Sequence, residues 1–374
     1  MFLLIYESGS FRICEKLNKS DLQNNGKAFL HFRLKCEGTS EYSDVELYTK
    51  DELIDSCFVS GKWENVNADV ECYLFGGEKC AVLEIKNEKN EYLSVADVRF
   101  FVERKNLFDG GILYQIAPKG VQMMGYVYVT KEKKVLVIDG GNAVDWQELT
   151  RVINLHGGVV HHWFITHYHN DHIGAVLEIF ERKQIKTEKI YFDFPPAELL
   201  SDRGDNDNPL VEKWLHTLPS DAILITPKKG DCYEIDSVKV RVLNNAAFEK
   251  NIEYVNNTSI VYKLETGKTN VLFTGDLALK CNDYLCDEWF RKQLSDCTVV
   301  QMSHHGNNGV CRDFYEYTAV EICLYPTPLW LWNNDRGGGK NSSFWTTLHT
   351  REWMREKNVK KNYTAITDKT AVIY

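Results

Sequence analysis

Hydrophobic and polar positions divide the chain into two parts that differ in their periodicity. From residue 1 to about residue 105, short runs of alternating apolar and polar residues, such as residues 28–34 and 80–85, are separated by turns rich in Asn, Gly, Ser and Lys. Several short strands with regular turn signals are typical of a β-sandwich or a similar all-β module. We therefore expect a β-rich N-terminal domain over residues 1–105, whose role the sequence does not indicate.

From about residue 110 the pattern changes to apolar strands that alternate with helices. Apolar residues at helical spacing from Ile173 to Phe180 predict a helix directly after a cluster of histidines. We therefore expect a second domain, of mixed helices and strands, over residues 106–374. Its other predicted elements are strands over residues 126–129, 135–138, 159–165, 189–192, 238–243, 271–274, 321–326 and 370–373 and helices over residues 146–155, 211–218 and 345–357.

The composition is that of an ordinary globular protein with an acidic excess. The 374 residues are 44% hydrophobic and 26% charged, and the formal net charge is −9. An acidic chain does not concentrate polyanions by its overall field, so a nucleic-acid substrate would need a local basic groove. The charge argues against a general nucleic-acid-binding protein without excluding a nucleic-acid substrate.

Cysteine use and the first residues favour a cytoplasmic location. The 11 cysteines are scattered and form no repeated Cys-x-x-Cys spacing, so we expect reduced thiols, many of them packed as small hydrophobic side chains. The first residues lack the basic region of a signal peptide. No stretch approaches the roughly 20 apolar residues of a membrane span, so no membrane partner is expected.

Residues 166–174, Thr-His-Tyr-His-Asn-Asp-His-Ile-Gly, carry the strongest chemical signal in the chain. Imidazole and carboxylate groups are the ligands of zinc and similar divalent metals. Alternation in an extended segment places His167 and His169 on one side. Asp171 and His172 follow where the chain turns into a helix, so they can form a second site beside the first. A histidine-rich surface turn is the alternative interpretation.

Four further polar elements adjoin apolar strands. Strand ends along one edge of a sheet are where functional loops collect, so these elements are expected to join the histidine run. They are the Asp-Gly-Gly of residues 139–141, the Asn-Asn-Thr-Ser of residues 256–259, the Thr-Gly-Asp of residues 274–276 and the Ser-His-His-Gly of residues 303–306.

This set of motifs, in this order, resembles the metallo-β-lactamase superfamily over roughly residues 108–374. The His-His-Gly motif and the pairing of Asn-Thr-Ser with Thr-Gly-Asp resemble one subgroup in particular. It contains the hydrolase-like domain of bacterial DNA-uptake (competence) proteins and the phosphorylcholine esterases. The resemblance implies an α+β fold, the αββα sandwich, with its metals at one edge.

The resemblance also implies a role for each motif residue. Asp171, as a ligand, and His305 are the expected catalytic residues. His305 would face the substrate, for contact or for protonation of the leaving group, although His304 and His305 could be exchanged. The implied ligands are His167 and His169 for a first metal, Asp171, His172 and His304 for a second metal, and Asp276 as a bridge between the two.

Neighbouring residues are expected to support these ligands. Asp139 would accept an imidazole N–H and fix the tautomer of a ligand, or it would cap the Gly-Gly turn. Many family members carry a further histidine before the Thr-Gly-Asp motif. Here Asn244 stands in the corresponding stretch, and His216 is expected on a helix surface. An amide oxygen there favours manganese, or lower occupancy of the first site, over tight zinc binding. We expect one or two divalent cations, zinc first and manganese second.

Two loops outside these motifs contain further candidates. The Asp-rich residues 202–208 lack the spacing of an EF-hand calcium loop and are expected to form a solvated edge of the site. The Gly-rich residues 333–340 offer Arg336, Lys340 and flexible backbone N–H groups, to which a phosphate could bind.

The chemistry that follows is hydrolysis. Two cations that share a water lower its pKa from about 15.7 toward 7 and stabilise charge on the attacked oxygen. The expected function is a metal-dependent hydrolase that uses a metal-bound hydroxide on a phosphodiester, whether a nucleotide, a nucleic acid or a phosphoester small molecule. Carboxyl-ester or lactone hydrolysis on the same metals is one alternative. A non-catalytic metal-binding module for sensing or interaction is another, and the intact ligand set argues against it.

Overall fold

The computed structural model divides the chain into two compact units, Met1–Lys105 and Asn106–Tyr374. The Asp-rich residues 202–207 lie outside the described residues. The structure describes the backbone of the strands in the first unit, and in the second unit it describes residues 107–196, 208–248, 254–278, 280–367 and 369–374.

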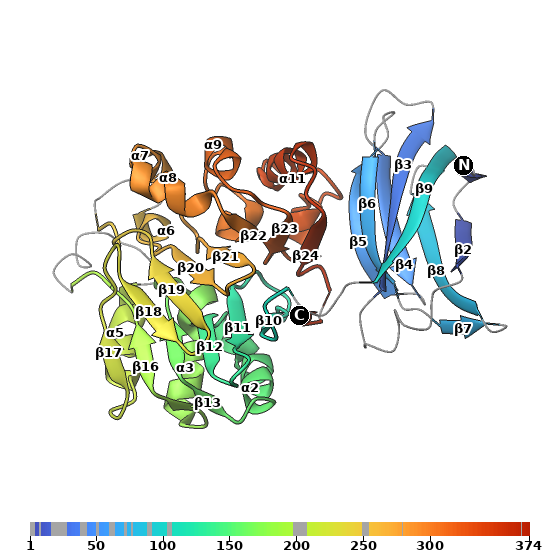
Figure 1. Cartoon of the computed structure of the whole chain (residues 1–374). Helices are drawn as coiled ribbons and strands as arrows, with labels where there is room; N and C mark the ends of the chain where they lie inside the picture. The colour runs from blue at the N-terminus through green and yellow to red at the C-terminus, as the bar shows by residue number, and fades with distance from the viewer. Residues whose placement is uncertain are drawn as a thin grey trace. The chain divides into compact units, whose positions relative to one another are not determined.

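The described part of the first unit consists of strands in two antiparallel sheets (Figure 1). One sheet has the strand order β1-β9-β3-β6, and the other has the order β2-β8-β4-β5, with β7 paired to β8. This agrees with the alternating pattern of the sequence. The strands are β1 (Leu4–Tyr6), β2 (Gly9–Glu15), β3 (Ala28–Glu37), β4 (Ser43–Thr49), β5 (Glu52–Val59), β6 (Glu64–Val70), β7 (Tyr73–Phe75), β8 (Glu78–Asn87) and β9 (Tyr92–Val102).

The second unit is built on two seven-stranded sheets, of which the first has the strand order β17-β16-β14-β12-β11-β10-β25. Its central strands β11 and β12 are buried along their whole length. Strands β12, β14, β16 and β17 pair in parallel, which places their carboxyl ends at one edge. The strands are β10 (Ile112–Gln115), β11 (Gly125–Val129), β12 (Val135–Asp139), β14 (His162–Phe164), β16 (Lys189–Tyr191), β17 (Ile223–Ile225) and β25 (Ala371–Ile373).

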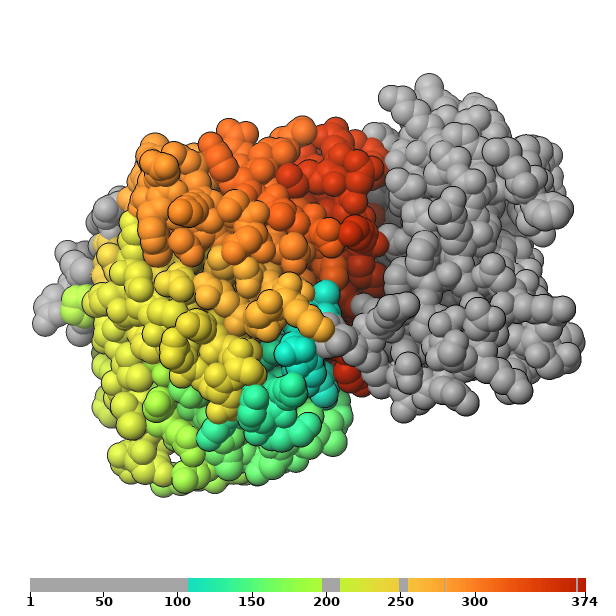
Figure 2. Space-filling model, viewed as in Figure 1, coloured from blue at the N-terminus to red at the C-terminus, as the bar shows by residue number. Residues whose placement is uncertain are grey.

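The second sheet has the order β18-β19-β20-β21-β22-β23-β24. Strand β19 alternates between buried and more exposed residues, as expected for a strand with one face in solvent. Strands β18 and β19 (yellow) lie at the surface on the face drawn in Figure 2. The strands are β18 (Cys232–Ile235), β19 (Val238–Val242), β20 (Tyr262–Glu265), β21 (Asn270–Phe273), β22 (Cys297–Gln301), β23 (Ile322–Tyr325) and β24 (Lys361–Thr364).

Helices cover the outer face of each sheet, so the second unit has four layers (Figure 1). Trp163 packs in the core under α2, α3 and α5, its neighbour Phe164 packs in the core between the sheets, and Phe290 packs in the core under α8, α9 and α11. This confirms the expected α+β fold, the αββα sandwich. The helices are α2 (Trp146–Asn154), α3 (Asn170–Arg182), α5 (Asn208–Thr217), α6 (Tyr254–Asn257), α7 (Cys281–Leu285), α8 (Glu288–Leu294), α9 (Arg312–Glu316), α10 (Leu329–Trp332) and α11 (Thr347–Glu356), with short 3₁₀ turns at Ala143–Asp145 and Ser303–Gly306.

The predicted strand over residues 159–165 is divided in the structure. Its first half, β13 (Val159–Val160), pairs with β15 (Lys186–Thr187) in a separate two-stranded sheet, and only its second half, β14, enters the main sheet. The interruption lies at His161. The imidazole Nδ1 of His161 accepts the backbone N–H of Val135, and the backbone N–H of His161 donates to the carbonyl of Val135. None of the described helices has the length and apolar character of a membrane span.

The core between the sheets can be tested at Phe164. The Phe164 ring stacks on Tyr191 with ring centroids 4.2 Å apart and is fully buried. We expect Phe164→Ala to lower the free energy of unfolding by about 3–5 kcal/mol, because it leaves a cavity between two packed sheets. Ile223→Ala, at a position 58% exposed, should change it by less than about 1 kcal/mol. Urea unfolding followed by tryptophan fluorescence measures both, and equal losses would contradict this account of the core.

Candidate metal centre

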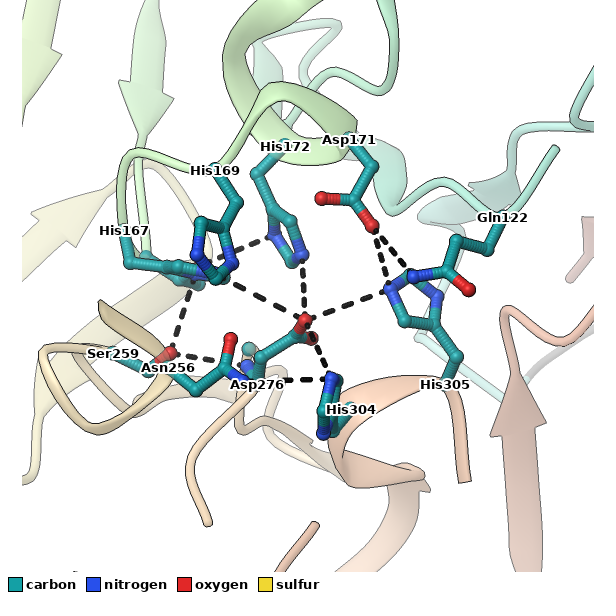
Figure 3. Close-up of polar contacts among 12 residues, drawn as sticks. Gln122, His167, His169, Asp171, His172, Asn256, Ser259, Asp276, His304 and His305 are labelled. Carbon is teal, nitrogen blue, oxygen red and sulfur yellow. Dashed lines mark hydrogen bonds and ion pairs between the residues drawn. The ribbon is translucent and has the colours of Figure 1, made fainter. Parts of the chain in front are cut away.

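Loops from both sheets bring the sequence motifs together (Figure 3). Strand β14 of the first sheet leads through residues 165–169 into α3, whose first turn contains Asp171 and His172. Strands β21 and β22 of the second sheet end directly before the Thr-Gly-Asp motif and shortly before the Ser-His-His-Gly motif. The site is therefore formed by loops of both sheets.

Two groups of side chains in these loops can each hold a cation, and Asp276 belongs to both groups. Within each group the candidate ligand atoms lie within 4.8 Å of one another. Figure 3 shows Asp276 at the centre, with imidazoles directed toward it from several sides. The first group consists of His167, His169 and Asp276, and the second consists of Asp171, His172, Asp276 and His305.

The carboxylate of Asp276 supplies the test of whether these residues fit a metal. Its Oδ2 atom lies 3.2 Å from Nε2 of His172, 3.5 Å from Nε2 of His305 and 4.0 Å from Nε2 of His167. Its Oδ1 atom is buried and accepts no hydrogen bond from the described residues. A buried carboxylate oxygen without a donor is costly, and a divalent cation would satisfy it. The donor set therefore fits one or two such cations.

Asp139 fixes the orientation of His172 from the side away from Asp276. One carboxylate oxygen of Asp139 lies 2.8 Å from Nδ1 of His172 and accepts the Thr166 hydroxyl at 2.8 Å, and the other accepts the backbone N–H of Thr166 at 2.8 Å. This leaves Nε2 of His172 directed at Asp276, the arrangement found behind many metal-binding histidines. The Gly-Gly turn is capped instead by Asp145, whose Oδ2 accepts the backbone N–H of Asn142.

The other buried imidazoles are oriented in the same way. Nδ1 of His167 lies 3.1 Å from the Thr166 hydroxyl and 3.3 Å from the Ser259 hydroxyl. Nδ1 of His305 lies 2.8 Å from the carbonyl oxygen of Pro326. In each ring Nδ1 lies against an oxygen, so Nε2 is directed at the centre of the site.

Opposed effects determine the charge state of these groups. Burial lowers the pKa of His305, but the carboxylates of Asp276 and Asp171 outweigh burial and raise this pKa to about 10. Burial likewise lowers the pKa of His172, and Asp276 and Asp139 raise it well above its ordinary value. Burial, together with the neighbouring imidazoles, lowers the pKa of His167, which is therefore neutral. Without a cation, the carboxylates retain protons on two of the nitrogens that a metal would need.

The structure exchanges the two roles expected for the adjacent histidines. His305 joins the second group, and His304 lies outside it, with its Nε2 atom 3.9 Å from Oδ2 of Asp276 and 3.5 Å from the amide nitrogen of Asn256. Both histidines have a left-handed backbone, with φ of 51° and 56°. The chain therefore turns sharply after β22 instead of continuing it, and His305 is the histidine whose Nε2 atom lies 3.1 Å from Oδ2 of Asp171.

Asn244 does not take the place of a missing histidine ligand. Its side-chain oxygen accepts the backbone N–H of Val261 at 2.7 Å, and its amide group donates to the carbonyl oxygens of Ser259 and Asn245. The residue is buried and joins the end of β19 to the start of β20. Because its oxygen is already used by the backbone, the preference for manganese that we based on Asn244 loses its structural support.

The Gly-rich loop is likewise not preformed for a phosphate. The carboxylate of Asp335 accepts the backbone N–H groups of Gly337 and Gly339 at 2.7 and 3.0 Å, so these donors already bind an anionic group. The guanidinium of Arg336 lies over the ring of Phe344, and the ammonium nitrogen of Lys340 is buried.

Three residues that sequence analysis did not single out adjoin the ligands. The amide of Gln122 donates to Oδ2 of Asp171 at 3.2 Å, Asn256 lies beside His304, and the Ser259 hydroxyl accepts the backbone N–H of Asp276 at 3.0 Å. The Asn-Asn-Thr-Ser motif signalled the last two, although the structure places its first two residues in α6 and not at the start of a strand. No sequence signal marks Gln122. His216 has the expected place on α5, where its ring contacts the carbonyl oxygen of Glu212.

Comparison with known proteins identifies the family. A family model described as the metallo-β-lactamase superfamily matches residues 122–319, more than half of the chain. The chain belongs to the metallo-β-lactamase superfamily. Membership in this superfamily and the two His/Asp groups together support a metal-dependent hydrolase in general, with divalent cations as its cofactors. The subgroup expected from the sequence remains a prediction.

Several solved structures resemble the chain at low identity. The metallo-β-lactamase-fold protein YhfI from Bacillus subtilis is 12% identical, with a TM-score of 0.45, over 71% of this chain and 100% of that chain. A HARLDQ-motif metallo-β-lactamase of Cronobacter sakazakii is 12% identical, with a TM-score of 0.34, over 52% and 74% of the two chains. The diiron β-hydroxylase CmlA from Streptomyces venezuelae is 9% identical, with a TM-score of 0.42, over 73% and 55%. No curated protein matches the chain.

Asp139→Asn tests the orientation of His172. An amide at this position presents an N–H₂ group to a donor, so we expect metal affinity to fall about 10–100-fold. Asp236→Asn is the matched control, because Asp236 also has a left-handed backbone and accepts a threonine hydroxyl but lies on the surface. Competition with a chromogenic chelator measures both variants. Equal affinity in Asp139→Asn and the native protein would refute this role.

Metal uptake should release protons. In the metal-free protein His172 and His305 are protonated at pH 7 on nitrogens that a cation needs, so a rise in pH from 6 toward 8 should strengthen binding. Titration calorimetry in buffers of different ionisation enthalpy counts the released protons. His216→Gln should leave the count unchanged. Zinc affinity that is independent of pH over this range would contradict the prediction.

Proposed function

We propose that residues 106–374 form a metal-dependent hydrolase domain that acts on a phosphodiester. The observation that carries the proposal is that two ligand groups share the carboxylate of Asp276. Adjacent cations that share a carboxylate are suited to in-line displacement at phosphorus, where both the attacking and the leaving oxygen carry charge. The resemblance of the motifs to the DNA-uptake and phosphorylcholine-esterase subgroup supports the same substrate class.

The cations would be held by His167 and His169 in the first group, by Asp171, His172 and His305 in the second, and by Asp276 in both. When bound, they supply an activated water and neutralise charge on the attacked phosphoryl oxygen. A donor set of imidazoles and carboxylates suits zinc, and manganese is the second candidate. Four of the six side chains are almost fully buried, so the protein excludes water from the back of the site.

His304 is suited to proton transfer at the leaving group. Its imidazole is 18% exposed, whereas the imidazole of His305 is 1% exposed, so His304 lies on the side open to a substrate. Asn256 lies beside its Nε2 atom, and Asp276 is 3.9 Å away. An imidazole in this place can hold a proton and deliver it to a departing oxygen, while the amide of Asn256 can donate a hydrogen bond to the substrate. We therefore assign His304 the proton-donor role that the sequence suggested for His305.

Substrate class can be decided with a panel of chromogenic compounds. We expect the zinc-loaded protein to hydrolyse bis(p-nitrophenyl) phosphate faster than p-nitrophenyl carboxyl esters or a chromogenic lactone. Preferential hydrolysis of the ester or the lactone would instead establish the alternative hydrolase class on the same metals. Absence of any hydrolysis in the panel at full zinc occupancy would favour the non-catalytic binding module.

Variants of the adjacent histidines separate chemistry from metal binding. His304→Ala should keep its zinc and lose about 10²–10⁴-fold in kcat, because it removes a proton donor. His305→Ala should lose zinc together with activity, because it removes a ligand. His216→Ala, at an exposed position on α5, is the matched control and should change neither. Elemental analysis and steady-state kinetics measure both quantities. Zinc loss in His304→Ala with full zinc in His305→Ala would reverse the assignment.

A further inference from the structure

Two cysteines lie side by side beyond the loops that carry the metal ligands. Cys281 begins α7, shortly after Asp276, and Cys311 stands at the start of α9, shortly after His305. Their Sγ atoms are 3.7 Å apart, and the backbone N–H of Cys311 donates to Sγ of Cys281 at 3.5 Å. Disulfide-bonded sulfur atoms lie about 2.05 Å apart, so a small movement would join them.

The surroundings give the two thiols different reactivity. Cys281 is fully buried, whereas Cys311 is partly exposed, so an oxidant reaches Cys311 first. A hydrogen bond from the Cys281 thiol lowers the pKa of Cys311, which favours its thiolate, the reactive form of a cysteine. The side-chain oxygen of Asn282 lies 3.3 Å from Sγ of Cys311 and 3.9 Å from Sγ of Cys281 and can accept a hydrogen bond from either thiol.

We propose that Cys281 and Cys311 form an oxidative modification site, at which a peroxide converts two thiols into a disulfide. The Cys311 thiolate attacks an oxygen of hydrogen peroxide, the O–O bond breaks, and a sulfenic acid and hydroxide result. Cys281, once deprotonated, attacks the Cys311 sulfur, the S–O bond breaks, and a second hydroxide leaves. With two protons taken from the thiols, the products are a disulfide and two waters. The peroxide is reduced, and the sulfur pair is oxidised by two electrons.

The disulfide would connect the two ligand-bearing loops of the second sheet. These loops already contact each other through two hydrogen bonds. The backbone N–H of His304 donates to the carbonyl oxygen of Gly275 at 3.1 Å, and the Ser303 hydroxyl donates to the carbonyl oxygen of Leu277. A covalent bond between Cys281 and Cys311 adds a link at the far end of both loops. Oxidation should therefore hold Asp276 and His305 in register and slow the release of metal.

The experiment uses the full chain loaded with zinc. After treatment with hydrogen peroxide and alkylation of the remaining thiols, peptide mass spectrometry should show a cross-link between Cys281 and Cys311 that dithiothreitol reverses. Zinc release to an excess of chelator should be several-fold slower in the oxidised protein and should recover after reduction. Cys311→Ser should abolish both effects. Cys286→Ser is the matched control, because Cys286 is exposed at the end of α7, and it should keep both effects.

Several results would overturn the proposal. Oxidation of Cys311 to a sulfinic acid without a cross-link would refute the disulfide, as would a cross-link from Cys311 to Cys286. Equal zinc release before and after cross-linking would refute the connection to the metal centre. The native protein supplies these measurements itself, so they decide the matter even where Cys311→Ser fails to fold. None of them requires phosphodiester hydrolysis, so failure here and failure of the proposed function are distinguishable.

Discussion

The metal centre depends on one buried carboxylate. Asp276 is 1% exposed, and its Oδ2 atom faces imidazoles from the histidine run and from the Ser-His-His-Gly motif, while its Oδ1 atom receives no hydrogen bond from the described residues. Burying a charge in this way is unfavourable unless opposite charge is brought to it. The protein does so by directing the Nε2 atoms of buried histidines at the same point. The carboxylate and the histidines thus require one another, and a divalent cation completes the balance of charge.

Several residues of the metal centre have a strained backbone. Asp139, His304 and His305 have positive φ angles, which cost energy in residues with a side chain. Gly275 also has a positive φ, and a Cβ atom there would lie 2.8 Å from atoms of Thr166. The close approach of the Thr-Gly-Asp turn to Thr166 is what brings a strand end of the second sheet against the histidine run of the first. The two packed sheets and their three hydrophobic cores hold these turns in place.

Much of the fold and several of the site residues follow from sequence patterns. The apolar runs that became β11, β12, β19 and β21 and the helical spacing that became α3 are local signals, and local signals are what periodicity detects. The structure places His167, His169, Asp171, His172 and Asp276 together because they stand at strand ends or in the first turn of a helix, where the direction of a side chain is largely set by the element.

The remaining assignments depended on contacts that no local pattern encodes. A left-handed turn decides which of His304 and His305 belongs to the second ligand group. That turn is stabilised by contacts of His304 with the carbonyl oxygen of Gly275 and of His305 with the carbonyl oxygen of Pro326. The oxygen of Asn244 is taken by Val261, and the amides of the Gly-rich loop are taken by Asp335. In the last two cases a group of suitable chemistry already has another partner, which only the three-dimensional structure reveals.

The division of the ligands between two sheets has a consequence for how the protein matures. The histidine run belongs to the first sheet and precedes α3, whereas Asp276 and His305 follow strands of the second sheet much later in the chain. Both ligand groups contain Asp276, so neither can form in a folding chain until β21 has joined the second sheet. The second group also contains His305 and must wait for β22. Such long-range contacts form slowly because loop closure must precede them. Tight metal binding should accordingly be among the last steps of folding, and the bound ion would link the two sheets of the sandwich.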